Sequence, residues 1–228
     1  RALGLDIVAV LDNDVIGGRP NAAAAVPLHA VAPGDDGGAA RRLARYAAVV
    51  AARYAEHARG PAGPIAVEPV PADDRDGGAG DDLAFGAAGY AAVRLTDGAI
   101  DAGRLHGPSD GTDGLDPAVH AAVVRLNVAL AANLALAPVG AVGAPRLVAA
   151  SSPPGRLHVR WDALADPAVA GYVVAWRRAG EARYAQTQWS SATEAVLDGL
   201  PTDGELRVAV AAADDLGHIG LFGPEGSR

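Results

Sequence analysis

Two short segments contain the residue types best suited to chemistry, and the first is Asp12-Asn13-Asp14. It comes directly after an apolar run, residues 7–11, which is typical of a strand buried on both faces of a parallel sheet. Carboxylates at the carboxyl end of such a strand lie where open α/β sheets bind their ligands. An ordinary Asx turn after a strand gives the same pattern, so these residues by themselves leave both interpretations open.

The second segment, residues 106–113, has the sequence HGPSDGTD, in which Asp110 follows His106 by four positions. Imidazole and carboxylate groups are both good zinc ligands. A site with two zinc ions activates a bridging water for hydrolysis. A lone histidine in a Gly-rich loop is more often a solvated side chain, so this segment alone favours the solvated interpretation.

Composition excludes several classes of protein. The chain has 228 residues, enough for one large or two ordinary domains. Its net charge is −8 with no basic block, which argues against nucleic acid as a partner. No run approaches the roughly 18 apolar residues of a membrane span. The absence of cysteine excludes disulfides, thiolate catalysis and Cys-ligated zinc, and the absence of an initiator methionine suggests a piece of a longer protein or a processed product.

In the first part of the chain, short apolar runs alternate with longer helical stripes. Leu43, Tyr46 and Val50 recur at three- and four-residue steps, which predicts an amphipathic helix. Asp116 and Pro117 provide an N-cap and a favoured first helical residue. Strands alternating with helices predict an α/β fold. The predicted strands are residues 7–11, 26–31, 65–70 and 90–95, and the predicted helical segments are residues 39–57, 85–89 and 117–137.

In the second part of the chain the apolar residues recur with a period of two. The alternation of Leu157, Val159 and Trp161 is one of several such runs, and turn residues separate them. This spacing predicts an all-β sandwich. A segment rich in Pro and Gly, residues 138–145, precedes the change of period. The predicted division is an α/β domain over residues 1–138, a linker over 139–144 and a β-sandwich over 145–228.

The β-sandwich part resembles a fibronectin type III domain. The resemblance is carried by Trp161 in the second strand, by Gly171-Tyr172 at the start of the third and by the sequence LDGLP, residues 197–201, before the sixth. Leu206 stands where the sixth strand usually has a tyrosine, so we expect the hydrogen bond of that tyrosine to be absent. The resemblance implies a module that contacts another protein or the catalytic domain.

The first part resembles the bacterial co-catalytic di-zinc aminopeptidases, of the aminopeptidase Y and leucyl aminopeptidase-like metallopeptidase family. The sequence NDVIG, residues 13–17, matches their strand-end motif, and His106 with Asp110 matches the loop of their last zinc-ligand histidine. The resemblance implies that Asp14 and His106 are metal ligands of a site for two zinc ions. It also implies an incomplete zinc-peptidase-like sheet with flanking helices.

The chain departs from this family at two positions. The Gly-Asp-His-x-x-Phe segment of the family corresponds to residues 80–85, in which Asp82 replaces the histidine, and Asp97 replaces a glutamate. Residues 89–94, GYAAVR, match the family's Gly-Tyr-Pro-Ala-Val-Arg except for the proline. Further residues expected near the ligands or in the cleft are Asn13, Asp82, Phe85, Asp97 and Asp110.

The missing residues decide the functional interpretation. In the family, the first zinc histidine, the bridging aspartate and the paired glutamates all precede the Asp14 motif, and residues 1–13 contain no His and no Glu. The chain is therefore interpreted as the C-terminal part of a secreted or cell-envelope aminopeptidase that acts on peptides, inactive by itself. The alternative is a non-catalytic binding protein or pseudoenzyme that uses the fibronectin-like module. The remaining histidines are interpreted as structural or surface residues: His29, His57, His120, His158 and His218.

Overall fold

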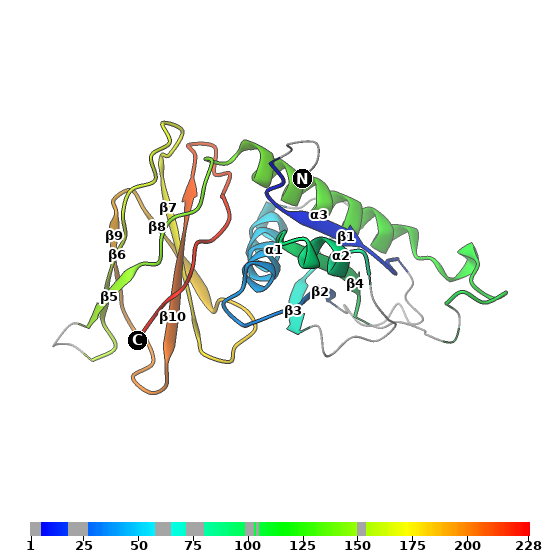
Figure 1. Ribbon diagram of the computed structural model, residues 1–228, viewed down its shortest axis with the longest axis horizontal. Helices are drawn as coiled ribbons and strands as arrows, with labels where there is room; N and C mark the ends of the chain where they lie inside the picture. Colours follow the sequence, from blue (N-terminus) through cyan, green and yellow to red (C-terminus); the bar gives the residue numbers. More distant parts are fainter. Residues whose placement is uncertain are drawn as a thin grey trace. The chain divides into compact units, whose positions relative to one another are not determined.

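The chain forms two compact units, residues Arg1–Ala131 and Ala132–Arg228, and each is described by itself. The computed structural model (Figure 1) describes residues 6–17, 27–57, 65–71, 80–98, 103, 105–149 and 154–228. The division between the units falls inside the helix α3 (Pro117–Leu136). A linker over residues 139–144 stays a prediction.

Unit 1 is a mixed α/β unit with a four-stranded sheet in the order β1-β4-β2-β3. β1 is parallel to β4, β4 is antiparallel to β2, and β2 is parallel to β3. The strands are β1 (Val10–Asn13), β2 (Leu28–Ala32), β3 (Val67–Pro71) and β4 (Ala92–Asp97). The helices are α1 (Ala39–His57), α2 (Asp82–Ala87) and α3, with a short 3-10 helix η2 (Thr112–Gly114).

Helix α1 has the predicted bounds, and its predicted apolar face is buried, with Leu43, Tyr46 and Val50 no more than 3% exposed. Two arginines of this helix, Arg41 and Arg45, are also buried, and the more deeply buried of them is Arg45. Its side chain is fully buried and donates from Nη1 to the Asp36 carbonyl at 2.6 Å, with an ion pair to the Asp36 carboxylate. The nearby Asp36 therefore compensates the buried charge of Arg45.

The strand bounds differ from the sequence expectation because strand pairing, and not apolarity, determines them. β1 begins at Val10 and continues to Asn13, whose partner in β4 is Leu95. Asp12 and Asn13 therefore lie within the strand, where the sequence placed them after it. β4 likewise extends to Asp97. The predicted helical turn over residues 85–89 is replaced by α2, which begins at Asp82.

Helix α3 is capped as predicted, because Asp116 Oδ1 accepts the backbone N–H groups of Ala118 at 2.9 Å and Val119 at 3.3 Å. One face is buried through Leu126 and Leu130, whereas Val128 on the opposite face is 64% exposed. By length and composition α3 is long and apolar enough to cross a membrane, whereas no such run was expected from the sequence. It is the one such helix in the described part of the chain.

Unit 2 is a sandwich of two antiparallel sheets with the orders β11-β10-β7-β8 and β5-β6-β9. An arrangement of four and three strands is common to immunoglobulin-like sandwiches, among them fibronectin type III domains. The strands of the first sheet are β7 (Gly171–Arg178), β8 (Gln186–Ser190), β10 (Leu206–Ala213) and β11 (Gly226–Ser227). Those of the second are β5 (Arg146–Ala149), β6 (Leu157–Arg160) and β9 (Glu194–Leu197).

The core of unit 2 follows the period-two pattern. Leu157 and Val159 point inward and are fully buried, and Trp161 packs edge-on against Tyr172 with ring centroids 5.4 Å apart. Val142 belongs to the same core and is 2% exposed. The packed unit therefore includes residues from the segment that composition marked as a linker.

Candidate functional site

The candidate site lies at the edge of the unit 1 sheet where β1 and β4 end side by side. The two strands are parallel neighbours, so their carboxyl ends lie at the same edge of the sheet. Asp14 donates its backbone N–H to Leu95 O at 3.1 Å. Val15 O accepts the N–H of Asp97 at 3.0 Å and the hydroxyl of Thr96 at 3.3 Å. The backbone on both sides of the Asp14 carboxylate is therefore fixed by β4.

The Asp14 carboxylate pairs with a buried arginine. Its Oδ2 accepts a hydrogen bond from Arg94 Nη1 at 3.0 Å, and the side chains are 39% and 1% exposed respectively. Among the described residues, this is the one hydrogen bond of the Asp14 carboxylate. One oxygen is thus engaged, and the other, Oδ1, remains available to a ligand.

Asp12 and Asp82 complete an acidic cluster, here defined as Asp12, Asp14 and Asp82 around Arg94. Asp12 Oδ2 accepts the backbone N–H of Asp82 at 3.2 Å. A Cβ at Gly80 would lie 2.7 Å from Asp12 Oδ2, 2.8 Å from Asp82 Oδ1 and 2.7 Å from Arg94 Cδ. Because the three side chains converge on that point, a side chain at position 80 would require at least one of them to shift.

The electrostatics of this cluster raise the pKa of Asp12 above its usual value. Burial is the largest cause that raises the pKa of Asp12, and the charges of Asp14 and Asp82 raise it further. The N–H of Asp82 that binds Asp12 acts in the opposite direction. Carboxylates outnumber the one buried guanidinium here, so the cluster would be relieved by a cation or by a proton.

The chain turns sharply after Asp14. Val15 has φ of 56°, a left-handed conformation that is a genuine outlier for a β-branched residue. Gly17 has φ of 89°, its carbonyl accepts the N–H of Asp116 at 2.8 Å, and a Cβ there would lie 3.1 Å from His120 Nδ1. Contacts with β4 and α3 therefore hold this turn in place.

Asn13, predicted near the ligands, contacts a helix. Its amide exchanges two hydrogen bonds with Asn127 of α3, at 3.0 Å and 2.8 Å. Because side chains alternate along a strand, Asn13 lies on the opposite face of β1 from Asp12 and Asp14. Figure 1 shows α3 running alongside β1. Asn13 therefore connects β1 to helix α3.

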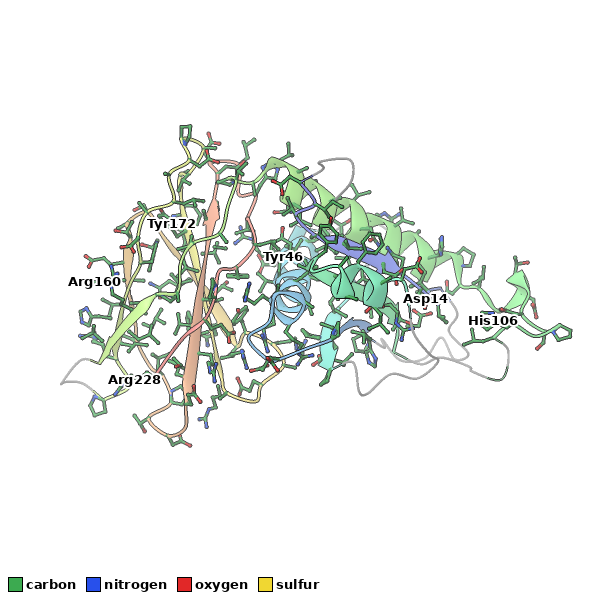
Figure 2. The ribbon with its side chains drawn as sticks, viewed as in Figure 1. Asp14, Tyr46, His106, Arg160, Tyr172 and Arg228 are labelled. Carbon is green, nitrogen blue, oxygen red and sulfur yellow. The ribbon has the colours of Figure 1, made fainter. Side chains whose placement is uncertain are left out.

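The second predicted ligand, His106, lies in an exposed loop. Its backbone has φ of 59°, and its N–H donates to Asp110 Oδ2 at 3.2 Å. Figure 2 labels Asp14 and His106 at the same end of unit 1. An approach of the two side chains to a shared zinc site stays a prediction. Of the other predicted cleft residues, Phe85 is 39% exposed and lies 6.3 Å from the Tyr90 ring, and Asp97 is buried.

Sequence reasoning missed Arg94, and it singled out Asp12 only as one of the carboxylates in the segment Asp12-Asn13-Asp14. The available signal was the single charge in the apolar run YAAVRL, residues 90–95. A charged residue inside an otherwise buried strand requires a partner of opposite charge. That argument predicts a carboxylate beside Arg94, but it does not identify which of the many aspartates provides it.

The other histidines lie in ordinary environments where the structure describes them. His29 is half-buried in β2, His120 is exposed on α3 and His158 is exposed on β6. His218 contacts Asp214 Oδ2 through Nδ1 at 2.7 Å. The side chain of His57 lies outside the described residues.

The residues present do not form a complete zinc site. Structural and catalytic zinc sites use at least three protein ligands. In the part of the chain that the structure describes, no three His, Asp or Glu side chains are arranged to hold a metal. Asp14 has one oxygen engaged by Arg94, and His106 is exposed, so a metal role for these two residues stays a prediction.

Comparisons with known proteins concern the β-sandwich. No protein-family model matches the chain, and no curated protein matches it significantly. The FN1–FN3 domains of chicken CNTN1 are 20% identical over 40% of this chain and 31% of that chain, with a TM-score of 0.36. The fn3 domain of human contactin 1 is 19% identical over 40% and 77%, with a TM-score of 0.35. An Fn3-like protein from Clostridium thermocellum is 21% identical over 40% and 90%, with a TM-score of 0.32.

At these TM-scores the similarity carries no argument, and the β-sandwich architecture of unit 2 rests on its own strand order. None of the structures named bears on unit 1, whose α/β architecture rests on its own sheet order.

Proposed function

We propose that unit 1 is part of a zinc-dependent aminopeptidase and contributes one edge of its metal site through Asp14 and His106. The observation that carries the proposal is the half-exposed Asp14 carboxylate at the carboxyl end of β1. The neighbouring strand β4 is parallel to β1 and leads into the segment that contains His106. Two parallel strand ends that open at one edge form the place where α/β sheets bind ligands.

In the intact parent, two zinc ions would activate a water for attack on the first peptide bond of a substrate. Residues of this chain would bind and orient. Asp14 and His106 would hold metal, and the acidic cluster would favour a positively charged group next to them. The general-base glutamate is expected upstream of Asp14. Without it, this chain by itself should not hydrolyse peptides.

Zinc titration of the full chain tests the proposal. Binding of Zn²⁺, followed by calorimetry, should weaken in the variants Asp14→Asn and His106→Gln. His158→Gln provides the control, because His158 is exposed on β6 of the other unit. Equal Zn²⁺ affinity in the wild type and in Asp14→Asn would contradict the metal role of Asp14. Release of a chromogenic amine from an aminoacyl substrate by the purified chain would contradict its predicted inactivity.

A second candidate function is a non-catalytic binding protein that acts through unit 2. One observation favours it: Trp189 is 49% exposed on β8, an edge strand of its described sheet. The strand β8 contains no charged residue, and exposed tryptophans and unprotected edge strands are both typical of protein interfaces. The upstream coding sequence separates the two candidates, because a His, an Asp and a Glu-Glu pair there support the peptidase and their absence supports the binder.

Both candidates share a proposed location outside the cytoplasm, either secreted or in the cell envelope. This location follows from the resemblance and from no residue of the chain. Fractionation of the producing cells, with the protein detected by antibody, tests it.

A further inference from the structure

Arg94 is a buried charge in the interior of the unit 1 sheet. Its strand, β4, lies between β1 and β2, and its register partner in β1 is Asp12. The Arg94 side chain is 1% exposed. A buried guanidinium is strongly unfavourable unless carboxylates surround it and accept its hydrogen bonds. The acidic cluster provides the negative charge that Arg94 requires, and the hydrogen bonds of the guanidinium determine which carboxylate it orients.

Arg94 binds one carboxylate oxygen, whereas another buried arginine of the same protein binds both oxygens of its carboxylate partner. Its Nη1 donates to Asp14 Oδ2, while Nε and Nη2 are buried without a hydrogen-bond partner among the described residues. The equally buried Arg177 of unit 2 uses Nε and Nη2 to bind both oxygens of Glu225, at 2.8 Å and 2.7 Å. All of the orienting effect of Arg94 is therefore directed at one oxygen of Asp14.

The backbone at Asp14 is fixed by the same strand. Leu95 O accepts the N–H of Asp14, and Thr96 and Asp97 both bind the carbonyl of Val15. Only the side-chain torsions of Asp14 then remain to be set, and Arg94 is the one residue that binds its carboxylate among those described. Fixing both the backbone and the side chain is what pre-organises a ligand residue.

We propose that Arg94 is the positioning residue of Asp14, which holds the carboxylate in one orientation with Oδ2 engaged and Oδ1 left for a divalent cation. The orientation of Asp14 follows from the geometry of unit 1. The use of Oδ1 by a cation rests on the proposed function. Groups that orient a ligand residue in this way typically change metal affinity by about 10–100-fold when they are replaced.

The replacement must separate orientation from charge. Arg94→Gln removes a positive charge next to a proposed cation site, which would strengthen cation binding, and it also removes the orienting bond. Arg94→Lys keeps the charge and loses the planar guanidinium, so it isolates orientation. The matched control is Arg125→Lys, because Arg125 is exposed on α3 in the same unit.

The first readout is the side-chain rotamer of Asp14 in the metal-free full chain, from three-bond NMR couplings between Asp14 Cγ and its backbone N and C′. The wild type and Arg125→Lys should show a single rotamer, and Arg94→Lys should show averaged couplings. Arg94→Gln is a second test in case the lysine variant does not fold. Unchanged couplings in a folded Arg94 variant would overturn the proposal.

The second readout is Zn²⁺ affinity, and it separates this proposal from the proposed function. If Asp14→Asn binds Zn²⁺ as the wild type does, the metal role of Asp14 is wrong, and the couplings alone decide the role of Arg94. If Asp14→Asn lowers affinity, Arg94→Lys should lower it by about 10–100-fold as well. Wild-type affinity in Arg94→Lys would then overturn the positioning role.

Discussion

The buried ion pair between Arg177 and Glu225 should be a main determinant of the stability of unit 2. Both side chains are at most 1% exposed. Arg177 donates from Nε and Nη2 to the two carboxylate oxygens of Glu225 at 2.8 Å and 2.7 Å, and from Nη1 to Glu181 O at 2.9 Å. The variant Glu225→Gln keeps the size of the side chain and removes its charge. It therefore removes the carboxylate charge that pairs with the buried Arg177 guanidinium.

Removing one partner of a buried pair costs about 3–5 kcal/mol, because the remaining charge is uncompensated. The amide introduced by Glu225→Gln retains one acceptor oxygen, so we expect a loss of about 3 kcal/mol, at the lower end of that range. Glu194→Gln is the matched control. Glu194 pairs with Arg160 at 3.1 Å, but their side chains are 60% and 62% exposed. An exposed pair contributes only about 0–1 kcal/mol.

Urea unfolding of the full chain, followed by tryptophan fluorescence, measures this difference. The three tryptophans are Trp161, Trp176 and Trp189, all in unit 2, so fluorescence reports the unfolding of that unit. Added salt should reduce the small effect of Glu194→Gln and leave that of Glu225→Gln nearly unchanged, because buried pairs are poorly screened. A Glu225→Gln chain with an unchanged m-value and less than about 1 kcal/mol of destabilisation would refute the reasoning.

Three further predictions concern packing and pH. The segment Ala132–Arg228 should be more stable than residues 145–228, because it retains Val142, which is 2% exposed. Burial of a valine stabilises by about 1.5–3 kcal/mol. Urea unfolding of the two segments measures the difference, and equal stabilities would contradict the role of Val142. Gly80→Ala should destabilise unit 1 by about 1–3 kcal/mol through overpacking. Helical circular dichroism should then show a lower midpoint of unfolding. An unchanged midpoint would show that the side chains around position 80 move freely. Because the folded pKa of Asp12 is raised above 3.8, its contribution to stability is largest at low pH and is lost as pH rises through the folded pKa. Asp12→Asn should therefore stabilise unit 1 at pH 7 relative to the wild type and lose this advantage at pH 3, and a pH-independent difference would contradict the charge explanation.

Local features of the chain were predicted well from the sequence. The bounds of α1 and the capping of α3 by Asp116 follow from helical periodicity and from hydrogen bonds between residues close in sequence. The alternation that begins at Leu157 likewise predicted a sandwich, because successive side chains on a strand point to opposite faces. Such patterns depend on a few consecutive residues, so they can be recognised without knowing the rest of the fold.

The composition of the candidate site was only partly predictable. Asp14 was identified from its motif, but its partner Arg94 lies 80 positions away. Similarly, Asp12 binds the N–H of Asp82 across 70 positions. A sequence with many aspartates offers many equivalent partners, and their choice depends on which strands pair and in which register.

By itself the sequence determined which segments are helical and which are extended, that an α/β unit precedes a β-sandwich, and that carboxylates lie near the end of an apolar strand. Only the tertiary structure decided that β1 ends at Asn13 beside β4, that Arg94 engages Asp14, and that Arg177 meets Glu225 across 48 positions. The reason is physical. Secondary structure follows from interactions within a few residues, whereas the partner of a buried charge is set by backbone pairing that brings distant segments together.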